Sequence, residues 1–480
     1  MRQPPVVLVT SIVFAVFSGA CGGGGSTGPA APPVITAVNG ATAPFGAVGS
    51  TVIIEGQNFG SVAGSVQFSN GTGGTVAATI AAPGDWTTTF IVTTVPAGAA
   101  TGPLVVHASG DTSNAVTFAV SQGVLFSPST VSWTSTSALP VGLSGHSMDA
   151  TTLKDQSTTT HAVYVLGGED STGALQNAVY YATIGNTGAV GSFTATTALP
   201  ESVAFARVFI ATPRNSAVTG VGYIYVVGGI TTVAGQRTTA IYRGTLAVNG
   251  TVSSWTSAGT LPAPLSSFGE AVVFGDLYIW GGATTGNAPV ATVYRTTIDA
   301  SGGLGTWQSL TPLPFKRAYF GAGAFGQYLY AFGGDSGTVS PNDSSISSTA
   351  FNDVVYAQID LKTRAIAAAG WTLNSNSLKK AVSKHRTVVA GGYVLVTGGL
   401  YNGASTGSTE ESYAQIGTSG SAGSFNGATG ANTISSSGGG NLFNHAEIGY
   451  VDGSGAFHVL VSGGDDVNTP GKKHKGVFYY

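Results

Sequence analysis

Cysteine is almost absent from this chain of 480 residues, which contains one, Cys21. With a single thiol, no disulfide within the chain supports the fold and no metal site is built from several cysteines. Charged residues are also scarce: Lys and Arg number 18 and Asp and Glu 21, which is 8% of the chain, and the net charge is -3. So few cations offer little to a phosphate backbone, which excludes nucleic acid as the expected partner.

The N-terminal apolar segment is too short to cross a membrane. It follows Arg2 and covers residues 6–17, whereas a lone spanning helix needs about 20 residues. A short apolar run between a basic residue and small residues is typical of a secretion signal. We therefore expect residues 1–20 to be a signal peptide and the protein to be exported.

The residues around Cys21 resemble the lipobox of bacterial lipoproteins. Ser18-Gly19-Ala20-Cys21 has small residues at the two positions before the cysteine, although Ser18 stands where the motif usually has Leu. The resemblance implies that Cys21 is lipidated, and several acyl chains on one cysteine would anchor the protein in a membrane of the cell envelope. Residues 21–32 then form a flexible tether, because they are rich in Gly. An ordinary cleaved signal with an incidental cysteine is the alternative.

Glycine is abundant, with 72 residues, in a chain where hydrophobic residues make up 42%. Few helix-forming Lys and Glu residues and many turn formers predict an all-β fold. Residues 33–120 alternate apolar and polar positions between turn signals, which is typical of an immunoglobulin-like sandwich of about 100 residues.

The stretch GSTVIIEGQNFG, residues 49–60, with VQF at 66–68, resembles the IPT/TIG domain. Domains of that family serve mostly as spacers or accessory binding modules on bacterial surface proteins, so the resemblance implies a spacer. We expect Gly56 and Gly60 to adopt positive φ in turns and Phe59 to pack inward. A ligand-binding role would need exposed aromatic residues, and Trp86 is the candidate.

A hydrophobic strand ending in Gly-Gly recurs through the rest of the chain. YIYVVGG is one copy, and the pairs begin at residues 167, 228, 281, 333, 398 and 463. Their spacing is closest to the ~50-residue kelch period, and a Trp or Phe and a Leu-Pro pair keep step with them. Residues 121–480 therefore resemble kelch repeats, which implies a six-bladed β-propeller. We expect the glycines to fit where backbones crowd and the aromatic residues to fill the space between blades.

The two ends of the repeat region predict how the ring closes. The chain finishes at KGVFYY, the third strand of the last repeat, and a strand that contains Trp133 precedes the first Gly-Gly pair. We expect the Trp133 strand to complete the last blade, which leaves no free sheet edge.

Polar residues that differ from repeat to repeat lie between each Leu-Pro and the next Gly-Gly, where a propeller has its channel mouth. They are His146, Arg207, Glu270, Lys316 with Arg317, Lys384 with His385 and Arg386, and Asn444 with His445. Arg207, Arg317 and Arg386 are suited to hold a carboxylate in a two-bond fork. Glu270 is suited to act as a base or to accept a sugar hydroxyl. Residues at these positions of kelch repeats also serve the fold alone, so a pure scaffold stays an alternative.

Two groups of kelch-like enzymes bear on the chemistry. The copper-radical chemistry of galactose oxidase needs a Tyr crosslinked to Cys, which the only thiol, Cys21, excludes. Bacterial sialic acid mutarotases are six-bladed kelch proteins that use Arg and acidic residues, but their catalytic residues cannot be matched here one by one. No HxH or HExxH spacing occurs among the 7 histidines, and Asp465-Asp466 is typical of a solvated turn, so we expect no metal and no cofactor.

The sequence thus predicts an exported, lipid-anchored protein of the bacterial cell envelope. Its channel mouth would recognise a glycan or a surface protein through His146, Arg207, Glu270, Arg317, His385, Arg386 and His445, with the sandwich as spacer. A sugar-modifying enzyme that uses Glu270, and a purely structural envelope protein, are the alternatives.

Overall fold

A computed structural model describes most of the chain from residue 31 onward. The described residues are 31–40, 45–121, 126, 128–155, 157–211, 222–232, 234–299, 301–342, 348–401, 411–427, 434, 442–454, 456–466, 469 and 471–480. Cys21, the expected signal peptide and most of the expected tether lie outside them. In the part of the chain that is described, no helix is both long and apolar enough to cross a membrane.

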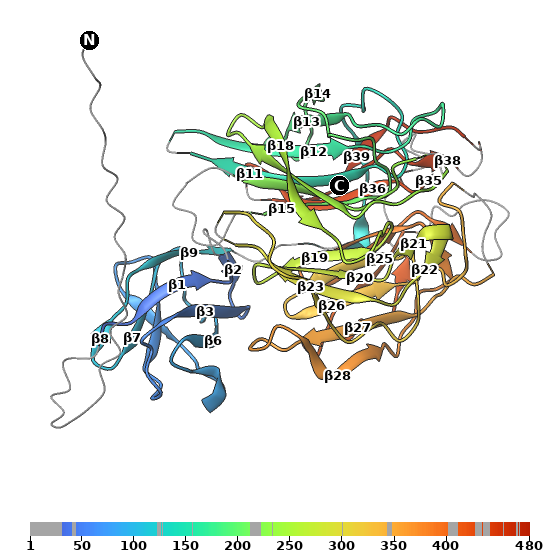
Figure 1. Ribbon diagram of the computed structural model, residues 1–480. Helices are drawn as coiled ribbons and strands as arrows, with labels where there is room; N and C mark the ends of the chain where they lie inside the picture. The colour runs from blue at the N-terminus through green and yellow to red at the C-terminus, as the bar shows by residue number, and fades with distance from the viewer. Residues whose placement is uncertain are drawn as a thin grey trace, which may run out of the picture.

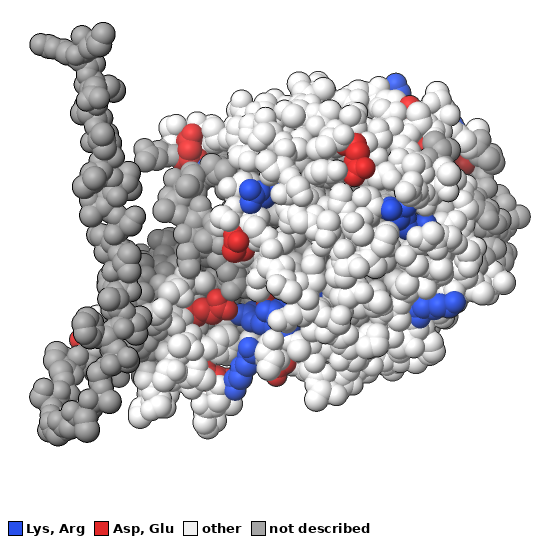
Figure 2. All heavy atoms as spheres, in the orientation of Figure 1, with Lys and Arg blue, Asp and Glu red and all other residues white. Residues whose placement is uncertain are grey.

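The structure contains a small β-sandwich beside a ring of larger sheets, and the sandwich is drawn in blue in Figure 1. On the face shown in Figure 2 charged side chains are sparse, and several of both signs lie where the two parts meet. The predicted fold class, an all-β protein with an immunoglobulin-like sandwich followed by a kelch-type propeller, is confirmed.

Two sheets form the sandwich. One consists of β1 (Val34–Val38), β3 (Thr51–Gln57) and β6 (Phe90–Thr94). The other has the order β2 (Phe45–Ala47), β9 (Val116–Ser121), β7 (Gly102–Ala108), β4 (Ser65–Ser69) and β5 (Thr75–Ala78), with β8 (Asp111–Thr112) paired to β7. A 3₁₀ turn, η1 (Pro83–Asp85), precedes β6.

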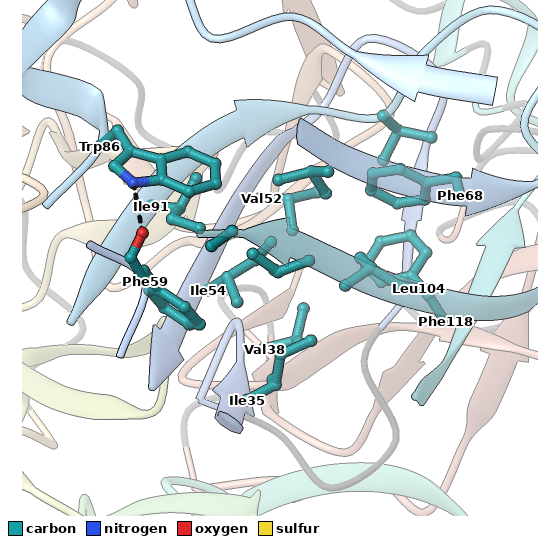
Figure 3. Packing of buried hydrophobic residues seen from close by; sticks show 14 residues of the cluster. Ile35, Val38, Val52, Ile54, Phe59, Phe68, Trp86, Ile91, Leu104 and Phe118 are labelled. Atoms are coloured by element: carbon teal, nitrogen blue, oxygen red, sulfur yellow. Dashed lines mark hydrogen bonds between the residues drawn. The ribbon is translucent and has the colours of Figure 1, made fainter. Parts of the chain in front are cut away.

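The apolar positions of the alternating strands meet between the two sheets of the sandwich (Figure 3). Phe59 is fully buried there, as expected, and the indole nitrogen of Trp86 donates a hydrogen bond of 3.0 Å to its carbonyl. Trp86 is therefore a core residue and does not offer an exposed face to a ligand. Gly60 has the expected positive φ of 72°. The expectation for Gly56 is wrong: it lies within β3, and a Cβ there would be 2.1 Å from the carbonyl oxygen of Val34, so close packing requires the glycine.

In the described residues six four-stranded sheets follow, and their strands are named from the innermost outward. The first is β11 (Ser147–Lys154), β12 (Thr159–Leu166), β13 (Val179–Thr183) and β14 (Thr194–Ala195); the second is β15 (Arg207–Ala211), β16 (Tyr223–Val227), β17 (Ala240–Leu246) and β18 (Val252–Thr260). The third is β19 (Gly269–Val273), β20 (Asp276–Trp280), β23 (Val293–Thr297) and β24 (Gln308–Ser309); the fourth is β25 (Gly321–Phe325), β26 (Tyr328–Phe332), β27 (Val354–Ile359) and β28 (Ile366–Leu373). The fifth is β30 (Arg386–Ala390), β31 (Tyr393–Thr397), β33 (Ser412–Gln415) and β34 (Asn426–Gly427); the sixth is β36 (Ala446–Val451), β37 (Phe457–Ser462), β39 (Val477–Tyr479) and β10 (Thr134–Ser135).

Short two-stranded sheets join the loops that lie beside the starts of the inner strands. They are β21 (Ala283–Thr284) with β22 (Ala288–Pro289), β29 (Val382–Ser383) with β32 (Leu400–Tyr401), and β35 (Leu442–Phe443) with β38 (Asp465–Asp466). Two further 3₁₀ turns are η2 (Pro128–Thr130) and η3 (Thr285–Asn287).

The strand YIYVV that precedes a Gly-Gly pair is the second strand, β16, of its sheet. Four of its five residues are buried, because a neighbouring sheet covers each face, as in other sheets that are covered on both sides. The inner strands contact one another in a closed cycle, β11, β15, β19, β25, β30, β36 and back to β11. This arrangement is that of propeller blades around an axis.

The sixth sheet is assembled from both ends of the repeat region. Thr134 pairs with Tyr479 and Ser135 with Phe478, so the strand next to Trp133 supplies the outer strand that the C-terminal repeat lacks. The sheets are also joined around the ring through the Gly-Gly pairs. The second glycine of each donates its N–H to a carbonyl of the next sheet, as from Gly168 to Val203 at 2.8 Å, and Gly464 returns to Leu143 at 2.7 Å.

Each first glycine has positive φ and close neighbours. Gly167 has a φ of 61°, and a Cβ on it would lie 2.3 Å from the carbonyl oxygen of Val203. A side chain would therefore meet backbone of the neighbouring sheet, which explains the glycine by both conformation and space.

Candidate functional site

A ring of backbone hydrogen bonds surrounds one end of the propeller axis. It is formed by the residues that precede the inner strands by two positions: Phe205 donates to Gly145 (2.6 Å), Ser267 to Phe205 (3.0 Å), Tyr319 to Ser267 (3.3 Å), Lys384 to Tyr319 (2.8 Å), Asn444 to Lys384 (3.0 Å) and Gly145 to Asn444 (2.9 Å). All six have φ between 53° and 59°. Five of them are not glycine, and left-handed backbone at such residues is strained and concentrates at functional sites.

The segment Val339 to Asn342 lies over this ring. Its carbonyl groups accept hydrogen bonds from three ring residues: Tyr319 to Val339 at 3.3 Å, Lys384 to Ser340 at 2.8 Å and Asn444 to Pro341 at 2.9 Å. The amide of Asn342 reaches Glu169 at 2.8 Å, on the other side of the ring. Lys384 and Asn444, which the sequence suggested for the channel mouth, are therefore used to hold this segment across the end of the channel.

Beyond the ring, the inner strands enclose an axial cavity of about 290 Å³. Every sheet contributes to its wall, with Ser147, Val208, Val272, Ala322, Thr387 and Ile448 among the lining residues. Ionisable side chains reach it from five of the six sheets: His146, Asp149, Arg207, Glu270, Arg386 and Glu447.

The structure brings together three residues that the sequence proposed, Arg207, Glu270 and Arg386, on three different inner strands. Neither guanidinium forms an ion pair with a carboxylate among the described residues; Arg207 Nε donates to the carbonyl of Phe268 at 2.5 Å. Burial lowers the pKa of Arg207, and burial together with the charge of Arg207 lowers the pKa of Arg386 to about 9. The two cations thus lie close together with donors still unused.

Sequence reasoning missed two carboxyl groups of the cavity, Asp149 and Glu447. Glu447 follows His445 by two positions, as Glu270 follows the equivalent Phe268, so alignment of the repeats was a sufficient signal for it. Asp149 lies three positions after His146, and no other repeat has an acidic residue at that position. Only the structure shows that its side chain lies on the face of β11 that lines the cavity. Backbone amides of Ile210 and Ala150 donate to it at 2.7 and 2.8 Å.

The carboxyl groups lie deep in the protein although water reaches the cavity, and burial raises their pKa. The pKa of Asp149 rises to about 7 and those of Glu270 and Glu447 to about 8, where the cation Arg207 partly offsets the effect of burial on Glu270. Near neutral pH these carboxyls are therefore mostly protonated, or close to half so for Asp149, while both arginines keep their charge.

The side chains of the three predicted histidines pack between neighbouring sheets. His146, His385 and His445 are buried at positions that Phe268 and Phe320 occupy in two other repeats. Their Nε2 atoms have partners: Ser462 Oγ at 2.8 Å for His146, the N–H of Gly321 at 3.0 Å for His385 and Thr397 Oγ1 at 2.9 Å for His445. Burial lowers the pKa of His146 and His385 to about 3, so they stay neutral.

Arg317 lies away from the cavity. Its side chain is fully buried, and it donates to both carboxylate oxygens of Asp353, at 2.7 and 3.0 Å, and to the carbonyl of Gly333 at 2.9 Å. It occupies the same repeat position as Leu143 and Leu265, three residues before Phe320, which packs between two sheets. Arg317 therefore stabilises the packing of the sheets and does not line the cavity, and Lys316 is exposed outside the cavity.

The cavity offers paired cations, neutral carboxyls and hydroxyls, which suit an anion that also carries hydroxyl groups. It does not offer a ligand set for a metal: in the described ranges no group of three or more His, Cys, Asp or Glu side chains is arranged to hold one.

Comparisons with known proteins add little to this geometry. No family model matches the chain, and no curated protein matches its sequence. Among solved structures, that of YjhT aligns with 71% of this chain and 95% of its own, at 14% identity and a TM-score of 0.48. The sheets themselves define the class: an all-β protein with a kelch-type propeller and an axial cavity. The resemblance of residues 33–120 to IPT/TIG domains stays a prediction.

Proposed function

We propose that the axial cavity binds an acidic sugar, a ligand with one carboxylate and several hydroxyl groups. The observation that carries this proposal is the pair Arg207 and Arg386, two partly buried cations that line one cavity and form no ion pair with a carboxylate among the described residues. Cations that are withdrawn from water are normally paired. A ligand carboxylate between them would supply the missing charge and accept bidentate hydrogen bonds.

The carboxyls of the cavity favour a sugar over a simple acid. With pKa values raised to about 8, Glu270 and Glu447 are mostly protonated at neutral pH, so each donates one hydrogen bond and accepts others without repelling an anion. Hydroxyl groups need both kinds of partner. The volume of about 290 Å³ is at the lower end of ligand pockets, which fits one sugar residue.

The setting we propose is the bacterial cell envelope. The signal-like N-terminus and the lipobox-like sequence before Cys21 support export and a lipid anchor. In this view the sandwich, an IPT/TIG-like spacer, carries the propeller away from the membrane toward a surface glycan. A protein partner would meet the same cavity through an acidic side chain.

A second candidate function is modification of the bound sugar. Glu270 has a pKa of about 8 beside Arg207, and a group with a pKa near the working pH is suited to general acid–base catalysis. Magnetisation-exchange NMR between the two anomers tests this, followed at H1 of glucuronic acid or at the H3 protons of N-acetylneuraminic acid. Faster exchange with the wild type than with Glu270→Gln would support an enzyme, and equal rates would leave a binding protein.

Calorimetry with the purified protein tests the binding proposal. We expect N-acetylneuraminic acid or glucuronic acid to bind and neutral N-acetylglucosamine not to bind. Arg207→Ala should abolish binding, whereas Lys316→Ala, which removes an exposed cation outside the cavity, should not change it. Equal binding of acidic and neutral sugars, or no binding of any acid, would refute the proposal.

A further inference from the structure

The sandwich lies at the end of the propeller opposite the segment Val339 to Asn342. That segment covers the starts of the inner strands, whereas the sandwich contacts the turns at their far ends. A Cβ on Gly40 of the sandwich would be 2.4 Å from the carbonyl oxygen of Phe274, in the turn after β19. Since that segment crosses one end of the channel, we take the other end, beside which the sandwich lies (Figure 1), as the entrance for a ligand.

Arg364 fixes the sandwich to the propeller. It lies in the β27–β28 turn with a φ of 60°, and its carbonyl accepts a hydrogen bond from Tyr278. The same carbonyl position in two other sheets belongs to Gly250 and Gly302. The side chain explains the exception: Arg364 pairs with Glu55 of β3 at 2.7 Å and is 5% exposed.

Beside this contact is a cleft of about 540 Å³ between the two domains. The sandwich contributes Thr51, Asp85 and Thr94 to its wall, and the propeller contributes Gln327, Gln358 and Lys362, among others. The side-chain amides of Gln327 and Gln358 and the ammonium of Lys362 form no hydrogen bond with any described residue. The cleft thus contains two amides and one ammonium group that are able to form hydrogen bonds with a ligand.

The cleft and the cavity share a strand. Ala322 of β25 lines the cavity and Gln327, in the turn that follows, lines the cleft. Five residues of chain span at most ~17 Å, so a ligand of a few sugar residues is long enough to touch both.

We propose that the cleft is a second glycan subsite, which binds the sugars that follow an acidic residue held in the cavity. The protein would then recognise the end of an acidic oligosaccharide in preference to a free monosaccharide. This inference rests on the proposed function of the cavity. Polar side chains with free amides are the partners that sugar hydroxyls need, and clefts between domains are common ligand sites.

Calorimetry with the purified full chain tests the second subsite. The ligands are N-acetylneuraminic acid and a trisaccharide and a pentasaccharide that end in it. The variant Gln327→Ala/Gln358→Ala removes both amides of the cleft. Gln415→Ala is the matched control, because Tyr413-Ala-Gln415-Ile repeats Tyr356-Ala-Gln358-Ile one sheet further on and does not line the cleft.

We expect the oligosaccharides to bind about tenfold more tightly than the monosaccharide, a gain of two or so hydrogen bonds. The double variant should lose that gain and keep the monosaccharide affinity, and Gln415→Ala should change neither. If the monosaccharide binds and the oligosaccharides bind no better, the cavity site stands and the subsite is refuted. If no acid binds at all, both proposals are refuted.

Discussion

Two arginines that lie away from the cavity and two arginines that line it differ in whether a carboxylate pairs with them. Arg317 is fully buried and forms a two-bond fork with Asp353, and Arg295 pairs with Asp276 at 2.8 Å. Arg207 and Arg386 are partly buried, and no carboxylate forms an ion pair with them in the described part of the chain. Breaking a buried pair leaves the remaining charge uncompensated, whereas a cation that has no partner carries its desolvation cost until a ligand binds.

The difference shows why burial or residue type alone does not identify a site. Arg317, Arg207 and Arg386 come from equivalent stretches of the repeats, shortly before a Gly-Gly pair, whereas Arg295 lies in the third strand of its sheet. What separates them is the partner: Asp353 forms a two-bond fork with Arg317, whereas among the described residues no carboxylate forms an ion pair with Arg207 or Arg386. The arginines that form no ion pair with the fold are the reason why we propose the cavity as a ligand site.

Truncating one arginine of each kind tests most directly whether paired and unpaired arginines have different roles. Arg317→Ala removes a fully buried side chain and leaves the partly exposed Asp353 without its partner, and it should lower the free energy of unfolding by about 3 kcal/mol. Arg386→Ala removes a cation without a fork partner and should change it by no more than ~1 kcal/mol, while it abolishes binding of an acidic sugar. Urea denaturation and calorimetry measure the two effects, and equal destabilisation by both variants would contradict the distinction.

The pH dependence of the free energy of unfolding tests whether the carboxyl groups of the cavity are protonated in the folded protein. The pKa of Glu270 is about 8 in the folded protein against an ordinary value of 4.5, so the folded state binds more protons than the unfolded chain between these values. The free energy of unfolding should therefore fall as pH rises from 5 to 8.

Glu270→Gln removes this titrating group, and its stability should fall less over the same pH range. Asp299→Asn is the control: Asp299 is exposed, and hydrogen bonds from Ser301 lower its pKa, so its contribution is lost only in acid. Denaturation curves of the wild type and both variants at several pH values measure this difference. A Glu270→Gln variant whose stability falls as steeply as that of the wild type would show that the glutamate is already ionised.

The smallest effect concerns Arg364, a paired arginine that joins domains. Arg364→Gly relieves left-handed backbone, which costs roughly 1 kcal/mol for a residue with a side chain, but loses the contact with Glu55. The propeller should melt at nearly the same temperature, while the radius of gyration from small-angle X-ray scattering increases as the sandwich is released. An unchanged radius would show that Arg364 does not hold the domains together; Lys362→Ala, an exposed neighbour, serves as the control.

Much of the fold could be predicted from the sequence because its signals are local and repeated. The Gly-Gly pairs mark strand ends with positive φ, and the strand beside Trp133 pairs with the last repeat. The lining of the cavity was predicted only in part, and its role as a binding site stays a prediction. Arg207, Glu270 and Arg386 line the cavity, whereas Arg317 does not, and Glu447 was missed although it repeats the position of Glu270.

The sequence by itself determined the strands, the turns and the order of the repeats, because turn conformation and strand burial depend on neighbouring residues. Only the tertiary structure decided which polar residues share the cavity. Arg207 and Arg386 are far apart in the chain, and they meet because each inner strand turns one face toward a common axis. Whether a buried arginine finds a carboxylate depends on contacts between sheets and between strands, which local sequence does not specify.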